Sequence, residues 1–90
     1  SGMLEAHNRT FVVAFKGPKM KKDIADGKIT AEVSASEGRI AGQYLMYNPL
    51  IKGATVYMDF EPNNKTSELR IVLKKDGKNI SEVWSYQWLP

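Results

Sequence analysis

The stretch KITAEVSAS, at residues 28–36, alternates apolar and polar side chains along almost its whole length. Successive side chains of a β-strand point to opposite faces, so the pattern predicts an apolar face formed by Ile29, Ala31, Val33 and Ala35 and a polar face opposite it. A helix would repeat its apolar residues every three or four positions, and no segment of the chain sustains that period. The stretch therefore predicts a half-buried strand and an all-β fold.

Outward from this stretch, further segments alternate in the same way between Gly, Pro, Asn and Asp residues that favour turns. A polar loop is expected at residues 17–27. Six or seven short strands in one chain of this length predict a sandwich of two packed antiparallel sheets, which begins at about Asn8. The further predicted strands are residues 9–16, 39–47, 52–60, 66–74 and 79–89.

The length of 90 residues predicts one domain with one core. Ser1-Gly2-Met3 is typical of a cloning remnant, so we expect residues 1–7 to be a tag remnant and frayed linker, and residues 8–90 to be a domain of a larger protein. No run of about 18 apolar residues is present, and we expect no membrane insertion.

The net charge of +3 raises nucleic acid as a partner. The lysines, however, flank predicted turns, and no aromatic side chains are interleaved with them for base stacking, so we expect no nucleic-acid binding. The absence of cysteine excludes disulfides, thiol nucleophiles and zinc–thiolate sites.

The sequence offers little for catalysis or for a cofactor. His7 is the single histidine, and the acidic residues fall one per strand or turn. A glycosidase pair of carboxylates would need a cleft, which a six-stranded sandwich hardly provides. No glycine-rich loop stands between a strand and a helix to bind phosphate. We therefore expect no catalytic residue, no metal and no cofactor in this chain.

The last hairpin admits two registers, which turn its aromatic side chains to opposite faces. A two-residue turn at Asp76-Gly77 would pair Lys75 with Lys78 and would place Trp84 on the core face, together with the carboxylate of Glu82. Burial of an unpaired carboxylate costs on the order of several kcal/mol, which disfavours this register locally.

A three-residue turn at residues 75–77 would instead pair Arg70 with Glu82 as a structural ion pair. It would turn Trp84, Tyr86 and Trp88 outward as an apolar stripe, a candidate interface or ligand groove. A bulge near Val83 would restore the core placement, so the two registers stay open.

Several short motifs occur in a fixed order along the chain. They are FVVAF at 11–15, VSASEG at 33–38, Asn48-Pro49 followed by Lys52-Gly53, ELR at 68–70 and SEVWSYQ at 81–87. In this order they resemble the C-terminal domain of the periplasmic glucan biosynthesis protein family, G and D types. The resemblance covers nearly the whole chain, and its last motif is the most specific.

The resemblance implies an exported bacterial parent located in the periplasm, with a large N-terminal β-sandwich followed by this smaller, immunoglobulin-like one. It implies a role in making osmoregulated periplasmic glucans, which are β-1,2-linked glucose polymers. Any catalytic carboxylates of relatives would lie in the larger domain, so none is carried over to this chain. The G or D assignment stays open.

Three functions are compatible with the sequence. The first is a non-catalytic module that packs against the N-terminal domain of the same chain and supports it. The second is an independent carbohydrate-binding module, and the third is an unrelated adhesion or receptor-like sandwich, which composition alone permits. The aromatic residues that could stack on glucose rings are Trp84, Tyr86, Trp88, Tyr44, Tyr47 and Tyr57.

Overall fold

The computed structural model describes residues 8–90, so the predicted tag remnant and linker at 1–7 lies outside the described residues. Within residues 8–90 the chain forms strands with one short helix. The elements are β1 (Arg9–Phe15), α1 (Lys21–Ala25), β2 (Ile29–Ala35), β3 (Arg39–Asn48), β4 (Gly53–Glu61), β5 (Ser67–Lys75), β6 (Lys78–Asn79) and β7 (Trp84–Trp88).

The first five strands confirm the alternation, because each lies within one or two residues of its predicted bounds. Two predictions at this level were wrong. The polar loop at 17–27 contains α1, which at five residues is too short to produce a helical period in the sequence. The last predicted strand is divided into β6 and β7 by an irregular segment at residues 80–83.

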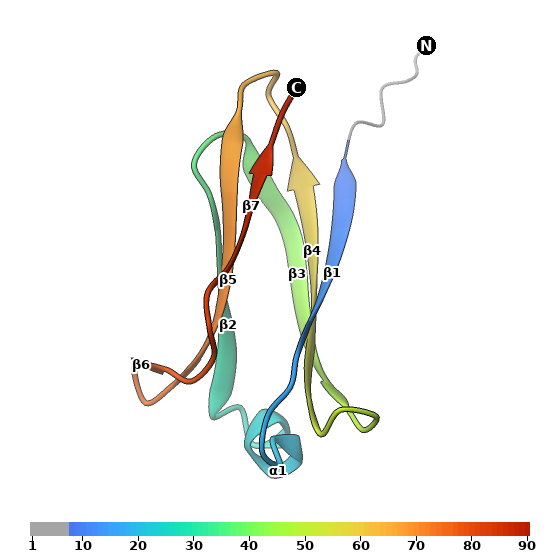
Figure 1. Ribbon diagram of the computed structural model, residues 1–90, viewed down its shortest axis with the longest axis vertical. Coiled ribbons are helices and arrows are strands. Elements are labelled where there is room, and N and C mark those ends of the chain that lie inside the picture. Colours follow the sequence, from blue (N-terminus) through green and yellow to red (C-terminus); the bar gives the residue numbers. More distant parts are fainter. Residues whose placement is uncertain (1–7) are drawn as a thin grey trace.

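Two antiparallel sheets face each other (Figure 1). One sheet has the order β1-β4-β3. In the other, β2 lies on one side of β5, and β6 and β7 follow one another along its other side. These orders are those of strands B-E-D and C-F-G in the immunoglobulin fold, which confirms the immunoglobulin-like sandwich.

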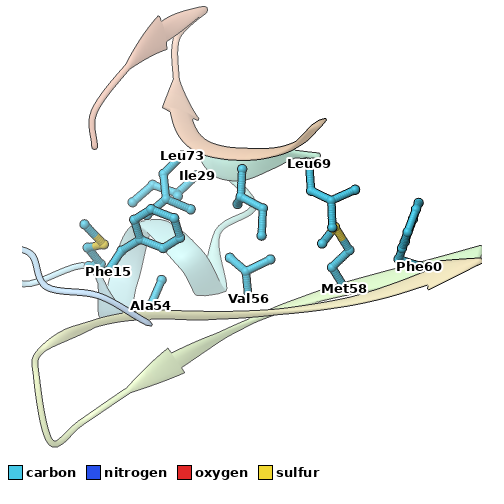
Figure 2. Close-up of a cluster of buried hydrophobic side chains, with 10 residues drawn as sticks. Phe15, Ile29, Ala54, Val56, Met58, Phe60, Leu69 and Leu73 are labelled. Carbon is cyan, nitrogen blue, oxygen red and sulfur yellow. The ribbon is translucent and has the colours of Figure 1, made fainter. Parts of the chain in front are cut away.

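The core lies between the two central strands, as Figure 2 shows. Ala54, Val56, Met58 and Phe60 of β4 were predicted to point inward, and all four side chains are fully buried. Three apolar residues of β5 complete the centre of the core from the opposite sheet; they are Leu69, Ile71 and Leu73.

The two ends of the sandwich carry different segments (Figure 1). The start of β1 and the end of β7 lie at one end, which we call the terminal end. The helix α1, the β3–β4 loop and the β5–β6 turn lie toward the opposite end. Within residues 8–90, no helix is long and apolar enough to span a bilayer.

Candidate functional site

The turn between β5 and β6 contains two residues with left-handed backbone conformations. Asp76 has φ 53° and Gly77 has φ 73°, and Lys75 pairs with Lys78 across them. Two successive positive φ values define a type I′ turn, for which Asp-Gly is a preferred sequence. The three-residue turn that local charge pairing favoured is therefore wrong.

The register of the hairpin shifts by two residues between β6 and β7. Lys75 lies opposite Lys78, but Ile71 lies opposite Trp84. Side chains alternate with period two, so a shift of two residues leaves Trp84 on the same face as Ile71, which is the core face. Glu82 falls in the irregular segment and is exposed. The chain thus places the tryptophan on the core face without burying the carboxylate.

Two predictions about this strand are consequently corrected. Arg70 lies opposite Ser85, so the expected cross-strand pairing of Arg70 with Glu82 is wrong. The outward aromatic stripe is wrong as well, because Trp84 and Trp88 are half-buried against the core. The energies explain the outcome: a cross-strand charge pair contributes about 0.2–1 kcal/mol, whereas burial of one large apolar side chain contributes about 1.5–3 kcal/mol.

The aromatic side chains of β7 close one open side of the sandwich. We call this cluster the aromatic seam; it comprises Phe11, Phe60, Trp84, Tyr86 and Trp88. The ring centroid of Phe11 lies 5.3 Å from that of Tyr86 and 5.9 Å from that of Trp84. Trp84 and Tyr86 stack with an interplanar angle of 5°, and Trp88 meets Phe60 edge-on at 5.7 Å. Tyr86 remains 47% exposed, so the seam also presents an apolar surface.

Trp88 occupies the part of the seam nearest the terminal end. The guanidinium carbon of Arg9 lies 5.6 Å from the centroid of its ring, which is a cation–π distance. The two residues line a depression of about 410 Å³ together with Pro62, Asn64 and Pro90. The indole nitrogen of Trp88 is buried, and no residue of the described range 8–90 accepts its hydrogen bond. A buried donor without an acceptor costs about 1–3 kcal/mol.

A second aromatic surface lies on the outer face of the β1-β4-β3 sheet. Tyr44 and Tyr57 are cross-strand neighbours, with ring centroids 6.4 Å apart. They are 63% and 37% exposed. A shallow hollow beside them has polar groups from Thr10 and Asp59. Tyr47, also named as a candidate, lies near the end of β3 beside lysines, and within residues 8–90 no ring contact links it to the pair.

The ionisable groups of the described range form no metal-binding cluster. Within residues 8–90, no group of three or more His, Asp or Glu side chains converges to hold an ion, and His7 lies outside the described residues. The clearest electrostatic feature is the 2.7 Å contact between Lys75 and Asp23. The hydrogen bond from Lys75 lowers the pKa of Asp23, and the same bond raises the pKa of Lys75. This pair joins α1 to the end of β5 and has a structural role.

Comparison with known proteins gives two findings. The family model described as "Periplasmic glucan biosynthesis protein, MdoG" matches residues 1–88. Glucans biosynthesis protein G 2 of Shewanella oneidensis is 34% identical over 88 residues, which are 97% of this chain and 16% of that protein. The chain therefore spans about a sixth of the length of this curated relative.

Proposed function

The chain belongs to the MdoG family of periplasmic glucan biosynthesis proteins, and from this membership we propose that it is a non-catalytic module of a longer periplasmic parent. In this role it packs against the glucan-processing part of the parent and supports it. The 16% coverage of the curated relative favours a module, because most of such a protein lies outside the matched segment.

The proposed contact surface is the part of the aromatic seam around Trp88. One observation carries this assignment: the buried indole N–H of Trp88 has no acceptor within residues 8–90. A carbonyl or carboxylate oxygen from the rest of the parent would remove the cost of this unpaired donor. The depression around Trp88 and Arg9 lies at the terminal end, where the first and last described residues are close to the site.

The test is to add this chain to the separately produced remainder of the parent and to follow the indole N–H resonances by NMR. We expect the Trp88 resonance to shift at saturation while the Trp84 resonance moves less. Trp88→Phe removes the N–H but keeps an aromatic ring, and it should weaken the association about tenfold or more, the effect of losing one buried hydrogen bond.

Trp84→Phe is the matched control, since Trp84 lies in the same seam but does not line the depression. The proposed contact surface is abandoned if the two parts associate and the Trp88 resonance stays unchanged. An absence of any association would contradict the packing role itself.

The tyrosine pair supports a second candidate function, independent glucan binding. Tyr44 and Tyr57 expose their rings side by side, and aromatic rings stack on the apolar C–H faces of sugars. Thr10 and Asp59 beside them offer hydrogen-bonding partners for hydroxyl groups. This arrangement favours a glucan chain lying across the outer face of the sheet.

Titration of the chain with linear and cyclic β-1,2-glucans, followed by amide shifts, tests this second function. The expected shifts are centred on Tyr44 and Tyr57 and disappear in Tyr44→Ala, while Tyr47→Ala is the control. No response at about millimolar glucan, the weak limit of specific binding, excludes independent binding.

A further inference from the structure

The lysines of this chain are gathered at one end of the molecule. Nine of the ten belong to the segments opposite the terminal end: the end of β1 and the turn after it, α1 and the loop to β2, the β3–β4 loop and the β5–β6 hairpin (Figure 1). We call this region the lysine end. Its lysines are Lys16, Lys19, Lys21, Lys22, Lys28, Lys52, Lys74, Lys75 and Lys78.

Acidic partners neutralise only a part of this charge. Asp26 contacts Lys22 at 2.8 Å, Asp23 contacts Lys75 and Glu32 contacts Lys74 at 3.6 Å. The other six lysines make no ion pair within residues 8–90; they are Lys16, Lys19, Lys21, Lys28, Lys52 and Lys78. The lysine end therefore keeps a net positive charge, since its nine lysines face four carboxylates, those of Asp23, Asp26, Glu32 and Asp76.

The backbone fixes two of these lysines in strained positions. Lys19 has φ 32° and Lys52 has φ 53°, conformations in which residues other than glycine are uncommon. The amide of Met20 donates to the carbonyl of Lys52 at 3.4 Å, so the two turns lie against each other. Together with Tyr47, the lysines of these turns line a shallow hollow of about 510 Å³. The cationic surface is thus built on ordered turns.

An exposed apolar side chain projects from the same end. Leu50, in the β3–β4 loop, is 92% exposed. Its amide donates to the side-chain oxygen of Asn48 at 3.0 Å, and the amide of Ile51 donates to the carbonyl of Asn48 at 3.3 Å. This tight turn presents Leu50 to solvent two residues before Lys52.

From the unpaired lysines around an exposed leucine, we propose that the lysine end binds the surface of a bilayer that contains anionic phospholipids. The lysines contact the phosphate headgroups, and Leu50 enters the boundary between headgroups and acyl chains. Surfaces that bind membranes peripherally combine these two features, basic residues and an apolar side chain. The contact is peripheral. It departs from the expectation of no membrane insertion only by the side chain of Leu50.

The composition of the lysine end favours a lipid surface over a soluble polyanion. Its cations are lysines spread over several turns, and the three arginines, which bind single phosphates in bidentate fashion, lie in β1, β3 and β5. A soluble anion would also gain nothing from Leu50. Because the lysine end is opposite the terminal end, it stays accessible when the rest of the parent packs at Trp88.

Co-sedimentation with vesicles tests the proposal. We expect no binding to phosphatidylcholine vesicles and clear binding when about a third of the lipid is phosphatidylglycerol, with a decrease as sodium chloride rises from about 50 to about 300 mM.

Lys19→Gly with Lys52→Gly should weaken binding about 25-fold, since one lysine near the surface contributes about fivefold. Glycine is favoured at both positions, so the double variant should fold. Leu50→Ser should weaken binding about tenfold.

The matched control removes two positive charges elsewhere. The double variant Lys65→Gln with Arg70→Gln changes two residues outside the lysine end. Its vesicle affinity should stay within about twofold of that of the unchanged chain, because screening confines the attraction to roughly a Debye length. Equal losses in the control pair and the Lys19/Lys52 pair would overturn the proposal, as they would indicate a response to net charge alone. A second result would also overturn the proposal: Leu50→Ser binds vesicles as well as the unchanged chain, and an oligonucleotide or glycerol phosphate competes fully with the vesicles. This result would assign the surface to soluble anions.

Discussion

The backbone amide of Leu73 donates a hydrogen bond to the side-chain hydroxyl of Ser81, at 2.9 Å. The carbonyl of the same residue accepts from the amide of Ile80 in the ordinary antiparallel manner. The Ser81 hydroxyl therefore replaces a backbone acceptor at the point where the hairpin leaves the β6 register. The same hydroxyl donates to the carbonyl of Glu82 at 2.9 Å, which fixes the irregular segment before β7.

Replacement of this hydroxyl tests its role in the register shift. Ser81→Ala leaves the amide of the fully buried Leu73 without an acceptor, and we expect a loss of about 1–3 kcal/mol in the free energy of unfolding. Urea denaturation measures it. Ser85→Ala is the control, since Ser85 is exposed in β7, and it should change stability by less than about 0.5 kcal/mol. Equal effects of the two variants would refute the role given to Ser81.

Arg70 and Glu82 give a test of the corrected register. Because Arg70 lies opposite Ser85, a double-mutant cycle of Arg70→Gln and Glu82→Gln should show a coupling energy below about 0.5 kcal/mol. Each single variant should also be nearly neutral, since both side chains are exposed. A coupling near 1 kcal/mol, the upper range for a cross-strand ion pair, would support the three-residue turn instead.

The fold was predictable because burial imposes a period on each strand, but the register of the last hairpin was not. The alternation in KITAEVSAS and in β4 reports directly which side chains face the core. The register, by contrast, depended on whether residues 79–89 form one continuous strand. The two-residue turn at Asp76-Gly77 and the core placement of Trp84 occur as the first register predicts. The burial of Glu82 that this register also implied does not occur, and neither does the pairing of Arg70 with Glu82. The irregular segment at residues 80–83, which one serine hydroxyl fixes and which shifts the register by two residues, leaves no period in the sequence. The exposure of Leu50 was not predicted either, because the sequence pattern does not show which apolar residue of a loop points to solvent.

Gly53 and Gly42 should respond very differently to the same substitution. A Cβ at Gly53 would overlap the carbonyl oxygen of Phe15, where the chain enters the turn before α1. Because backbone atoms give way poorly, Gly53→Ala should cost about 3 kcal/mol or more. A Cβ at Gly42 meets nothing within 4 Å, so Gly42→Ala should be neutral or slightly stabilising. Thermal unfolding compares the two variants; equal losses would contradict the close approach at Gly53.

The Asp23–Lys75 pair predicts how stability depends on pH. The pKa of Asp23 is lowered by its hydrogen bond from Lys75, so its contribution is present above the ordinary carboxyl pKa near 3.9 and is lost as the pH falls through the lowered value. The pKa of Lys75 is raised, so its contribution is present below about 10.4 and is lost as the pH rises through the raised value.

The unfolding temperature of Asp23→Asn should therefore lie below that of the unchanged chain at neutral pH, and the two should converge at acid and at alkaline pH. Asp26→Asn, which removes a more exposed partner of Lys22, is the control and should show a smaller difference. Parallel curves at all pH values would contradict the assignment.

The two open sides of the sandwich are closed in different ways. On one side the β2–β3 turn joins the sheets covalently; there, Ser67 donates to the carbonyl of Glu37 at 2.7 Å and Gln43 donates to the carbonyl of Ala31 at 3.1 Å. On the other side β1 and β7 meet through the rings of the aromatic seam. Ring contacts can separate without breaking a hydrogen bond, so local opening of the sandwich should begin on the side of β1 and β7. Amide hydrogen exchange should accordingly be faster in β1 and β7 than in β4 and β5, and the surface assigned to the parent's contact would be the first part of the sandwich to separate.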